Sequence, residues 1–259
     1  MTSAARRRES QGPDEVLTQL WESIYDPGTQ QAIRNLPVQS NWCCLDVGAG
    51  AGSMSYWLAN VVDQGTVLAV DVDTRQFDVS RSPNLTVREA DIHELEFEPH
   101  SFDLILARAV FGYLRRPEEA LQRALRWLAP GGWIVVEDFY YLPTEHVPSD
   151  HARAVTNAYL HQLRSTDADM HWGRRLPSTL AKAGLHSVDL RVTPLGPGQH
   201  ALGDELIRTR MRLQGPDLVR RGAVSAADLD SFVAGLGDPR SRDVATLLFS
   251  VWGQQPATR

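Results

Sequence analysis

A glycine-rich turn after the first apolar segment most constrains how this chain folds. Residues 42–47 are largely apolar, the run Gly48-Ala49-Gly50-Ala51-Gly52 follows, and residues 54–61 have a helical pattern. Glycine lets the backbone approach a ligand closely, and the N–H groups of a first helical turn point toward that ligand. A strand, a glycine turn and a helix in this order predict a small-molecule site at the end of a parallel strand.

The spacing of the glycines argues against a dinucleotide ligand. The dinucleotide fingerprint would need glycine at 48, 50 and 53, but the chain has Ser53 and its third glycine is Gly52. Asp46 stands just before the turn, where a carboxylate would repel a pyrophosphate and attract an ammonium group. S-adenosylmethionine (SAM) carries an ammonium group and a sulfonium but no phosphate, so the turn favours SAM over NAD.

Apolar strand patterns alternate with helical patterns along most of the chain. Further strands are predicted at 66–71, 85–87, 102–107, 133–138, 186–192 and 244–252, and helices at 13–36 (broken at Pro27-Gly28), 117–128, 151–164, 174–183, 201–214 and 225–236. Continuous apolar strands between helices indicate an α/β fold whose parallel sheet is covered on both faces. Ligands in such sheets bind beyond the carboxyl ends of the strands, which here carry Asp46, Asp71, Asp91, Ala107 and Asp138.

Five segments in this order resemble the class I SAM-dependent methyltransferases. They are LDVGAGAG at 45–52, LAVDVD at 68–73, EADIHELEF at 89–97, FDLILA at 102–107 and LAPGGWIVVED at 128–138. The resemblance covers roughly residues 41–139. It implies a Rossmann-like fold with a mostly parallel seven-stranded sheet, helices on both faces and a helical lid. The expected organisation is an N-terminal arm and helical cap at 1–38, then a methyltransferase domain at 39–259 with lid insertions at about 140–172 and 195–240.

The resemblance implies which residues hold the methionine part of SAM. Backbone at Gly48, Ala49 and Gly50 would line it, and Asp46 would support the turn or, through water, bind the ammonium group. Ala107 and Arg108, at the end of the fourth strand, would lie beside it. Because a cation beside a sulfonium is unfavourable, Arg108 is expected to point away, toward an acidic partner or the substrate.

The nucleoside part of SAM has its own predicted residues. Asp71 lies about 20 residues after the glycine turn, the offset at which such folds place a carboxylate on the ribose hydroxyls. The resemblance implies that Val72 packs against adenine, that Asp91 accepts from its amino group and that the Ile92 N–H meets the ring. Tyr25 is also assigned to the cofactor. A turn residue is the alternative for Asp71, and a helix N-cap is the alternative for Asp91.

A phenol or alcohol acceptor would require a general base. His171 is the best-placed candidate, since it leads from the lid back into the core. The alternative is a surface histidine. The base would then be His146, His151 or Asp138, or the reaction would need none.

Aromatic residues near the ligand-binding edge suggest an organic acceptor. Trp21, Phe111, Tyr113, Tyr140 and Tyr141 are the predicted substrate-binding residues, with ordinary core beneath the lid as the alternative. Aromatic faces also stabilise a sulfonium by cation–π attraction. Arg208, Arg210 and Arg212 are candidates to hold an anionic group, but their spacing spreads them around a helix and favours solvated charge.

Composition argues against nucleic acid as a partner and against insertion into a membrane. The net charge of −6 among 259 residues gives no footprint for nucleic acid. No apolar run approaches the length of a membrane-spanning helix, and residues 1–12, expected to be a disordered arm, contain no apolar stretch typical of a secretory signal. A cytoplasmic protein without a metal site is therefore expected, and a homodimer is left open.

The sequence therefore predicts an enzyme of secondary-metabolite biosynthesis that transfers a methyl group from SAM to an O, N or C atom of a small organic acceptor. S-adenosylhomocysteine is the expected product. Two alternatives stay open at this point. One is a macromolecule methyltransferase acting on RNA or protein, and the other is a SAM-binding protein without methyl transfer.

Overall fold

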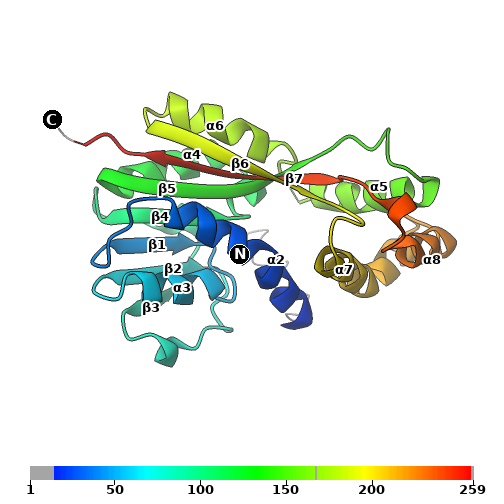
Figure 1. The fold of residues 1–259 in the computed structure, drawn as a ribbon, viewed down its shortest axis with the longest axis horizontal. Coiled ribbons are helices and arrows are strands. Elements are labelled where there is room, and N and C mark those ends of the chain that lie inside the picture. The colour runs from blue at the N-terminus through cyan, green and yellow to red at the C-terminus, as the bar shows by residue number, and fades with distance from the viewer. Residues whose placement is uncertain (1–14, 167, 258–259) are drawn as a thin grey trace.

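The computed structural model describes residues 15–166 and 168–257. The predicted N-terminal arm at 1–12 lies outside these residues. The described chain alternates strands and helices around one twisted sheet, with three further helices gathered beyond one end of it (Figure 1).

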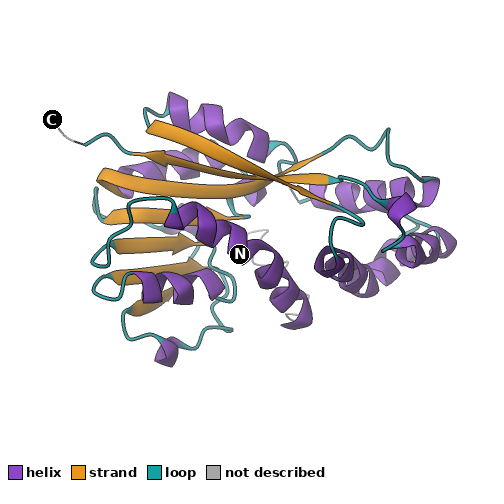
Figure 2. Ribbon diagram, viewed as in Figure 1, coloured by secondary structure: helices purple, strands orange, loops and turns teal. Residues whose placement is uncertain are grey.

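The sheet has seven strands in the order β3-β2-β1-β4-β5-β7-β6. Their bounds are β1 Cys43–Val47, β2 Thr66–Asp71, β3 Leu85–Glu89, β4 Phe102–Arg108, β5 Leu128–Tyr141, β6 His186–Leu195 and β7 Thr246–Gln254. The first five are parallel, and β7 runs antiparallel between β5 and β6 (Figure 2). The predicted mostly parallel, seven-stranded α/β sheet is confirmed.

Helices and short 3-10 turns connect the strands. The α-helices are α2 Glu15–Arg34, α3 Ser53–Val61, α4 Pro117–Trp127, α5 Asp150–Arg164, α6 Trp172–Lys182, α7 Ala201–Arg220 and α8 Ala226–Gly235. The 3-10 turns are η1 Val79–Arg81, η2 Ile92–Glu94, η3 Phe111–Tyr113 and η4 Pro239–Ser241.

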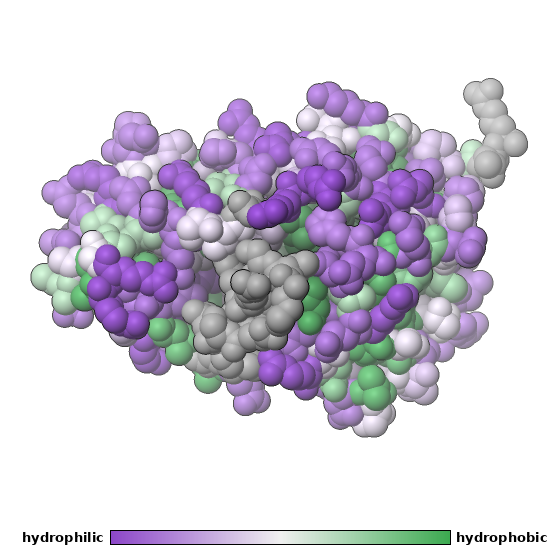
Figure 3. Space-filling view, turned by 180° about the vertical axis from the view of Figure 1, so that it is seen from behind, coloured by the Kyte–Doolittle hydropathy of each residue, from purple (hydrophilic) through white to green (hydrophobic). Residues whose placement is uncertain are grey.

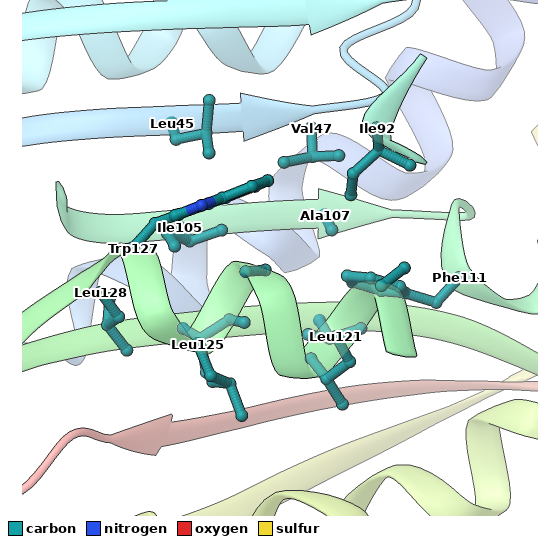
Figure 4. Packing of buried hydrophobic residues seen from close by; sticks show 14 of the residues in the cluster. Leu45, Val47, Ile92, Ile105, Ala107, Phe111, Leu121, Leu125, Trp127 and Leu128 are labelled. Atoms are coloured by element: carbon teal, nitrogen blue, oxygen red, sulfur yellow. The ribbon is translucent and has the colours of Figure 1, made fainter. Parts of the chain in front are cut away.

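Alternation along the apolar strands supplies both faces of the sheet with core residues. Leu45 and Ile105 face α4 and α6, where Trp127 is completely buried (Figure 4). Their neighbours Cys44 and Leu104 face the other way, toward α3 and the end of α2. Burial on both faces explains why the strands read as continuous apolar runs.

Two helices are longer than the sequence patterns suggest. The predicted break at Pro27-Gly28 is wrong, because α2 continues through Pro27, and α7 likewise runs past Gln214 and through Pro216 to Arg220. A proline removes one backbone hydrogen bond within a helix. Residues after each proline are buried, Thr29 and Ile33 in α2 and Leu218 in α7, and this packing holds the helix together.

Four helices stand at or beyond the carboxyl ends of the parallel strands. Helix α2 contacts α7, and α5 contacts α8. Helices α5, α7 and α8 have a small core of their own, built around Val155, Met211 and Leu218 (Figure 1). The segments predicted as lid insertions contain these three helices.

The close approach of α6 to β5 gives a test of the packing. A Cβ at Gly173 would lie 2.4 Å from the backbone oxygen of Asp138, so Gly173→Ala must push the helix away from the strand. We expect a loss of about 1–3 kcal/mol in the free energy of unfolding, measured in urea. Ser178→Ala, on the exposed face of the same helix, serves as the control and should change it by less than about 0.5 kcal/mol. Equal stability of the two variants would contradict this packing.

Candidate active site

The glycine turn is held by the carboxylate at the end of the neighbouring strand. Gly48, Gly50 and Gly52 have φ angles of 66°, 61° and 90°, which favour glycine. The backbone N–H of Gly50 donates to Asp71 Oδ2 at 2.8 Å, and the N–H of Asp73 donates to Asp71 Oδ1 at 3.1 Å. Asp71 is buried and therefore ties the turn after β1 to the end of β2.

A cavity of about 330 Å³, here named the turn cavity, opens along this turn. It is lined by Leu17, Thr18, Trp21, Glu22, Gly48, Ala49, Gly50, Ala51, Ser53, Asp73, Gln76, Arg108 and Ala109. A Cβ at Gly50 would have no atom within 4 Å, so this glycine faces open space. A helical cap over this edge was predicted, but its residues Thr18 and Glu22 were not named, nor were Asp73 and Gln76. The second acid of the run Val70-Asp71-Val72-Asp73 was the sequence signal for Asp73.

Asp46 faces away from this space. It is buried and accepts a hydrogen bond from Ser55 Oγ on α3 at 2.6 Å. Burial raises the pKa of Asp46 to about 6, opposed by the Ser55 hydrogen bond and by Arg108. Of the two predicted roles, this geometry corresponds to support of the turn.

Arg108 is neutralised by helix α2. Its Nη2 lies 2.7 Å from Asp26 Oδ1, and its Nη1 donates to Thr29 Oγ1 at 3.0 Å. Thr29 in turn donates to the buried Glu137 Oε2 at 2.5 Å. Burial raises the pKa of Glu22, and Asp26 raises it further. Arg108 thus binds an acidic partner, and the wall of the turn cavity that α2 provides is acidic.

A second cavity, here named the aromatic cavity, has a volume of about 760 Å³. Seven Trp, Tyr or Phe side chains line it, namely Trp21, Tyr25, Tyr113, Phe139, Tyr141, Tyr159 and Phe232. The Trp21 and Tyr25 rings lie 4.1 Å apart, and Phe139 meets Trp21 edge-on at 5.6 Å. Leu17 and Trp21 line both cavities, so the two spaces adjoin at this part of α2.

The predicted aromatic residues separate into three groups. Trp21, Tyr113 and Tyr141 line the aromatic cavity, together with Tyr25, which was assigned to the cofactor. Phe111 is completely buried in the core and does not line it. Tyr140 points to the other side of β5, against Phe249 and His171, because successive strand residues alternate between faces.

His171 is not brought to either cavity. It is the exposed N-cap residue of α6, and its ring lies 5.4 Å from that of Tyr140. The structure therefore does not support it as the base. His200 does line the aromatic cavity, but its Nδ1 accepts from the Gly203 N–H at 2.9 Å. In the neutral ring the proton is then on Nε2, which makes this nitrogen a donor.

Asp138 lies beneath η3 rather than in a cavity. Its Oδ2 accepts from the Gly112 N–H at 3.2 Å, and its Oδ1 is buried without a partner. Burial raises the pKa of Asp138 to about 8, while the hydrogen bonds from Gly112 and Phe111 oppose this. Asp138 therefore supports the turn that carries Tyr113 into the aromatic cavity.

The remaining predicted cofactor residues lie around the edge of the sheet. Asp91 Oδ1 accepts from the His93 N–H at 2.9 Å and caps η2, as the alternative for this residue proposed. Ile92 and Ala107 are buried in the core beneath α4. Val72 is partly buried next to Asp71. None of these four lines the turn cavity.

Among the described residues, no three His, Cys, Asp or Glu side chains gather in a way that would hold a metal ion. No described helix is both long and apolar enough to cross a membrane. Figure 3 shows hydrophilic side chains over most of one face, with apolar ones scattered among them.

The chain matches the methyltransferase domain family over residues 45–136. Those residues hold β1 to β5, the glycine turn and Asp71. The predicted resemblance to the SAM-dependent methyltransferases is confirmed over this segment, and SAM is the cofactor that the resemblance implies.

Proteins similar to this chain include two methyltransferases of Strobilurus tenacellus. The chain is 30% identical to methyltransferase str3 over 171 residues, which are 61% of this chain and 60% of that protein. It is 29% identical to methyltransferase str2 over 204 residues, 74% of this chain and 70% of that protein. The match to str3 thus spans less than two thirds of that relative.

Solved structures share the fold at lower identity. The [4+2]-cyclase SpnF has a TM-score of 0.63 at 15% identity, covering 92% of this chain and 83% of its own. A phosphoethanolamine N-methyltransferase 2 of Haemonchus contortus, solved with S-adenosyl-L-methionine, has a TM-score of 0.59 at 17% identity, covering 90% and 53%. Because one of these proteins is named a cyclase, the fold by itself does not determine the reaction.

The raised pKa of Asp138 predicts a pH dependence of stability. The folded-state pKa of about 8 lies above the ordinary value of 3.8, so the folded protein keeps a proton that the unfolded chain releases. This contribution is complete below the unfolded pKa and is lost as the pH rises through the folded one. The free energy of unfolding of the wild type, relative to Asp138→Asn, should fall by about 1.4 kcal/mol per pH unit in that window.

The measurement is urea unfolding of both proteins across the pH range. Asp63→Asn changes an exposed carboxylate, and its difference from the wild type should stay constant over the same range. Parallel curves for the wild type and Asp138→Asn would contradict the raised pKa.

Proposed function

We propose that this protein transfers a methyl group from SAM to a small organic acceptor held in the aromatic cavity. The observation that carries the proposal is that the turn cavity and the aromatic cavity share Leu17 and Trp21. A methyl donor in one space and an acceptor in the other would meet beside Trp21. Methyl transfer requires mainly this proximity, with the reacting atoms about 3–3.5 Å apart.

The methionine part of SAM would occupy the turn cavity. Gly48, Ala49 and Gly50 line it with backbone, and Glu22 lines the opposite wall on α2. A carboxylate there attracts the ammonium and sulfonium charges, and the Trp21 face adds cation–π attraction. The ion pair of Arg108 with Asp26 removes the cation that would otherwise oppose this binding.

The nucleoside part would extend along the ends of β2 and β3. Asp71 would accept from the ribose hydroxyls in addition to its bonds from the turn, and Val72 would pack against adenine. Asp91 and the Ile92 N–H would meet the adenine ring. Support comes from their common position at the carboxyl edge of the sheet, where ligands of such folds bind.

The volume of the aromatic cavity and the helices that cover it favour a small acceptor over a macromolecule. A volume of about 760 Å³ lies within the range of small-molecule pockets. Helices α5 and α7 supply much of its lining and would act as the lid that excludes water. Similarity to methyltransferase GfsG of Streptomyces halstedii and to the two Strobilurus methyltransferases supports methyl transfer, and the role in secondary metabolism stays a prediction. A cytoplasmic location stays a prediction.

Binding of SAM can be tested at the glycine turn. Gly50→Val would place a branched side chain in the turn cavity, and we expect SAM affinity to fall at least about tenfold in isothermal titration. Gly131→Val is the matched control. Gly131 also has a positive φ and no atom within 4 Å of a Cβ, but it lies outside both cavities. Equal SAM affinity of the two variants would remove the turn from the cofactor site.

Methyl transfer itself can be tested without knowing the acceptor. The protein is incubated with SAM, EDTA and a small-molecule extract of its source, and mass spectrometry searches for products heavier by one CH2 unit. Such products should form with the wild type despite EDTA and be lost with Gly50→Val. SAM binding without any methylated product would instead favour a SAM-binding protein with another reaction. Activity restored only by added metal would contradict the metal-free mechanism.

A further inference from the structure

The aromatic cavity contains a cation that has no carboxylate partner. Arg210 lines this cavity from α7, and its Nη1 donates to the Tyr159 hydroxyl at 3.2 Å. Its guanidinium also lies over the Tyr159 ring, 5.4 Å from the centroid. Among the described residues no Asp or Glu pairs with it, and its hydrogen bond to the neutral Tyr159 phenol leaves the positive charge uncompensated.

The other arginines near Arg210 are already neutralised or exposed. Arg208 pairs with Glu205 at 3.2 Å and donates to the Val233 carbonyl at 3.1 Å. Arg221, which also lines the cavity, pairs with Asp217 at 2.7 Å. Arg212 is exposed to solvent. Arg210 is therefore the cation in this cavity that remains for a ligand.

Tyrosine hydroxyls surround the guanidinium. Tyr25, Tyr113, Tyr141 and Tyr159 line the same cavity. Burial raises the pKa of Tyr25 to about 12 and holds the pKa values of Tyr113 and Tyr141 above their ordinary value, so these phenols stay neutral. Neutral phenols donate hydrogen bonds to an anion and do not compete with it for the arginine.

Further polar atoms in the cavity lack partners. The side-chain oxygens of Gln162 on α5 and Gln214 on α7 are buried and make no hydrogen bond. Unpaired buried polar atoms are costly and are uncommon in folded proteins. Both atoms are acceptors, so a ligand in this cavity would satisfy them only with hydrogen-bond donors separate from any carboxylate.

We propose that the acceptor is an apolar or aromatic carboxylic acid, anchored by its carboxylate at Arg210 and the tyrosine hydroxyls. This inference rests on the proposed function and names the substrate class. One unpaired arginine matches a monoanion, whereas a phosphate dianion would call for more positive charge. The apolar body would extend past Tyr25 to Trp21, because these two rings are in contact and Trp21 also lines the turn cavity. Arg210 is then a binding residue that selects the acceptor.

Direct binding of simple probes tests this assignment. Phenylacetate, phenylpropanoate and phenylbutanoate are titrated into the protein saturated with S-adenosylhomocysteine, each beside its neutral primary amide. At least one acid should bind about tenfold or more tightly than its amide. This preference should vanish in Arg210→Met and be reduced in Arg210→Lys, which keeps the charge but loses the planar fork. Arg212→Met, on the same helix, is the control and should retain it.

Three outcomes would overturn the assignment. The acids and their amides could bind the wild type equally well, none of the acids could bind it, or the preference for acids could persist in Arg210→Met. Tighter binding of phenylethyl phosphate than of the acids would also exclude a carboxylate as the preferred group. S-adenosylhomocysteine affinity is measured for each variant and should not change. If the wild type does not bind S-adenosylhomocysteine, the proposed function fails. If it binds S-adenosylhomocysteine but shows no preference for acids, only the assignment of Arg210 fails.

Discussion

The contact between Arg108 and Asp26 is the interaction on which both cavities depend. It joins the end of β4 to helix α2 across 82 positions of sequence, and both side chains are largely removed from solvent. Thr29 extends the contact to Glu137 on β5, so α2 is held to two neighbouring strands. Because α2 supplies Leu17 and Trp21 to both cavities, this anchorage fixes the position of the wall that the turn cavity and the aromatic cavity share.

The polar groups change in character from one cavity to the other. The turn cavity combines open backbone with the carboxylate of Glu22, which suits a cationic ligand, whereas Asp73 in its lining is paired with Arg75. The aromatic cavity combines rings and phenols with Arg210, which suits an anionic one. One cavity would attract the cationic methyl donor and the other an anionic acceptor, with Trp21 between them. This arrangement would orient the two molecules with little need for an acid–base group where the methyl group is transferred.

The sequence correctly predicted those parts of the structure that depend on local backbone pattern. The apolar runs, the glycine turn and the acid after β2 predicted the sheet and its binding edge, because strand alternation and positive φ angles are local properties. The predictions that failed concerned side chains and helix ends. Helix α2 continues through Pro27 because of the packing of its buried face, and His171 lies outside the cavities because α6 begins on the far side of β5.

The sequence by itself determined the order of strands and helices along the chain and the place of the glycine turn, since both follow from periodicity and from residues that are neighbours in sequence. Only the tertiary structure decided which side chains share a space. Spacing alone could not say that Tyr141, and not Tyr140, faces the aromatic cavity, or that Arg210 lines it while Arg208 pairs with Glu205. Those assignments depend on how α5 and α7 pack beyond the sheet, and this packing is set by contacts between residues far apart in sequence.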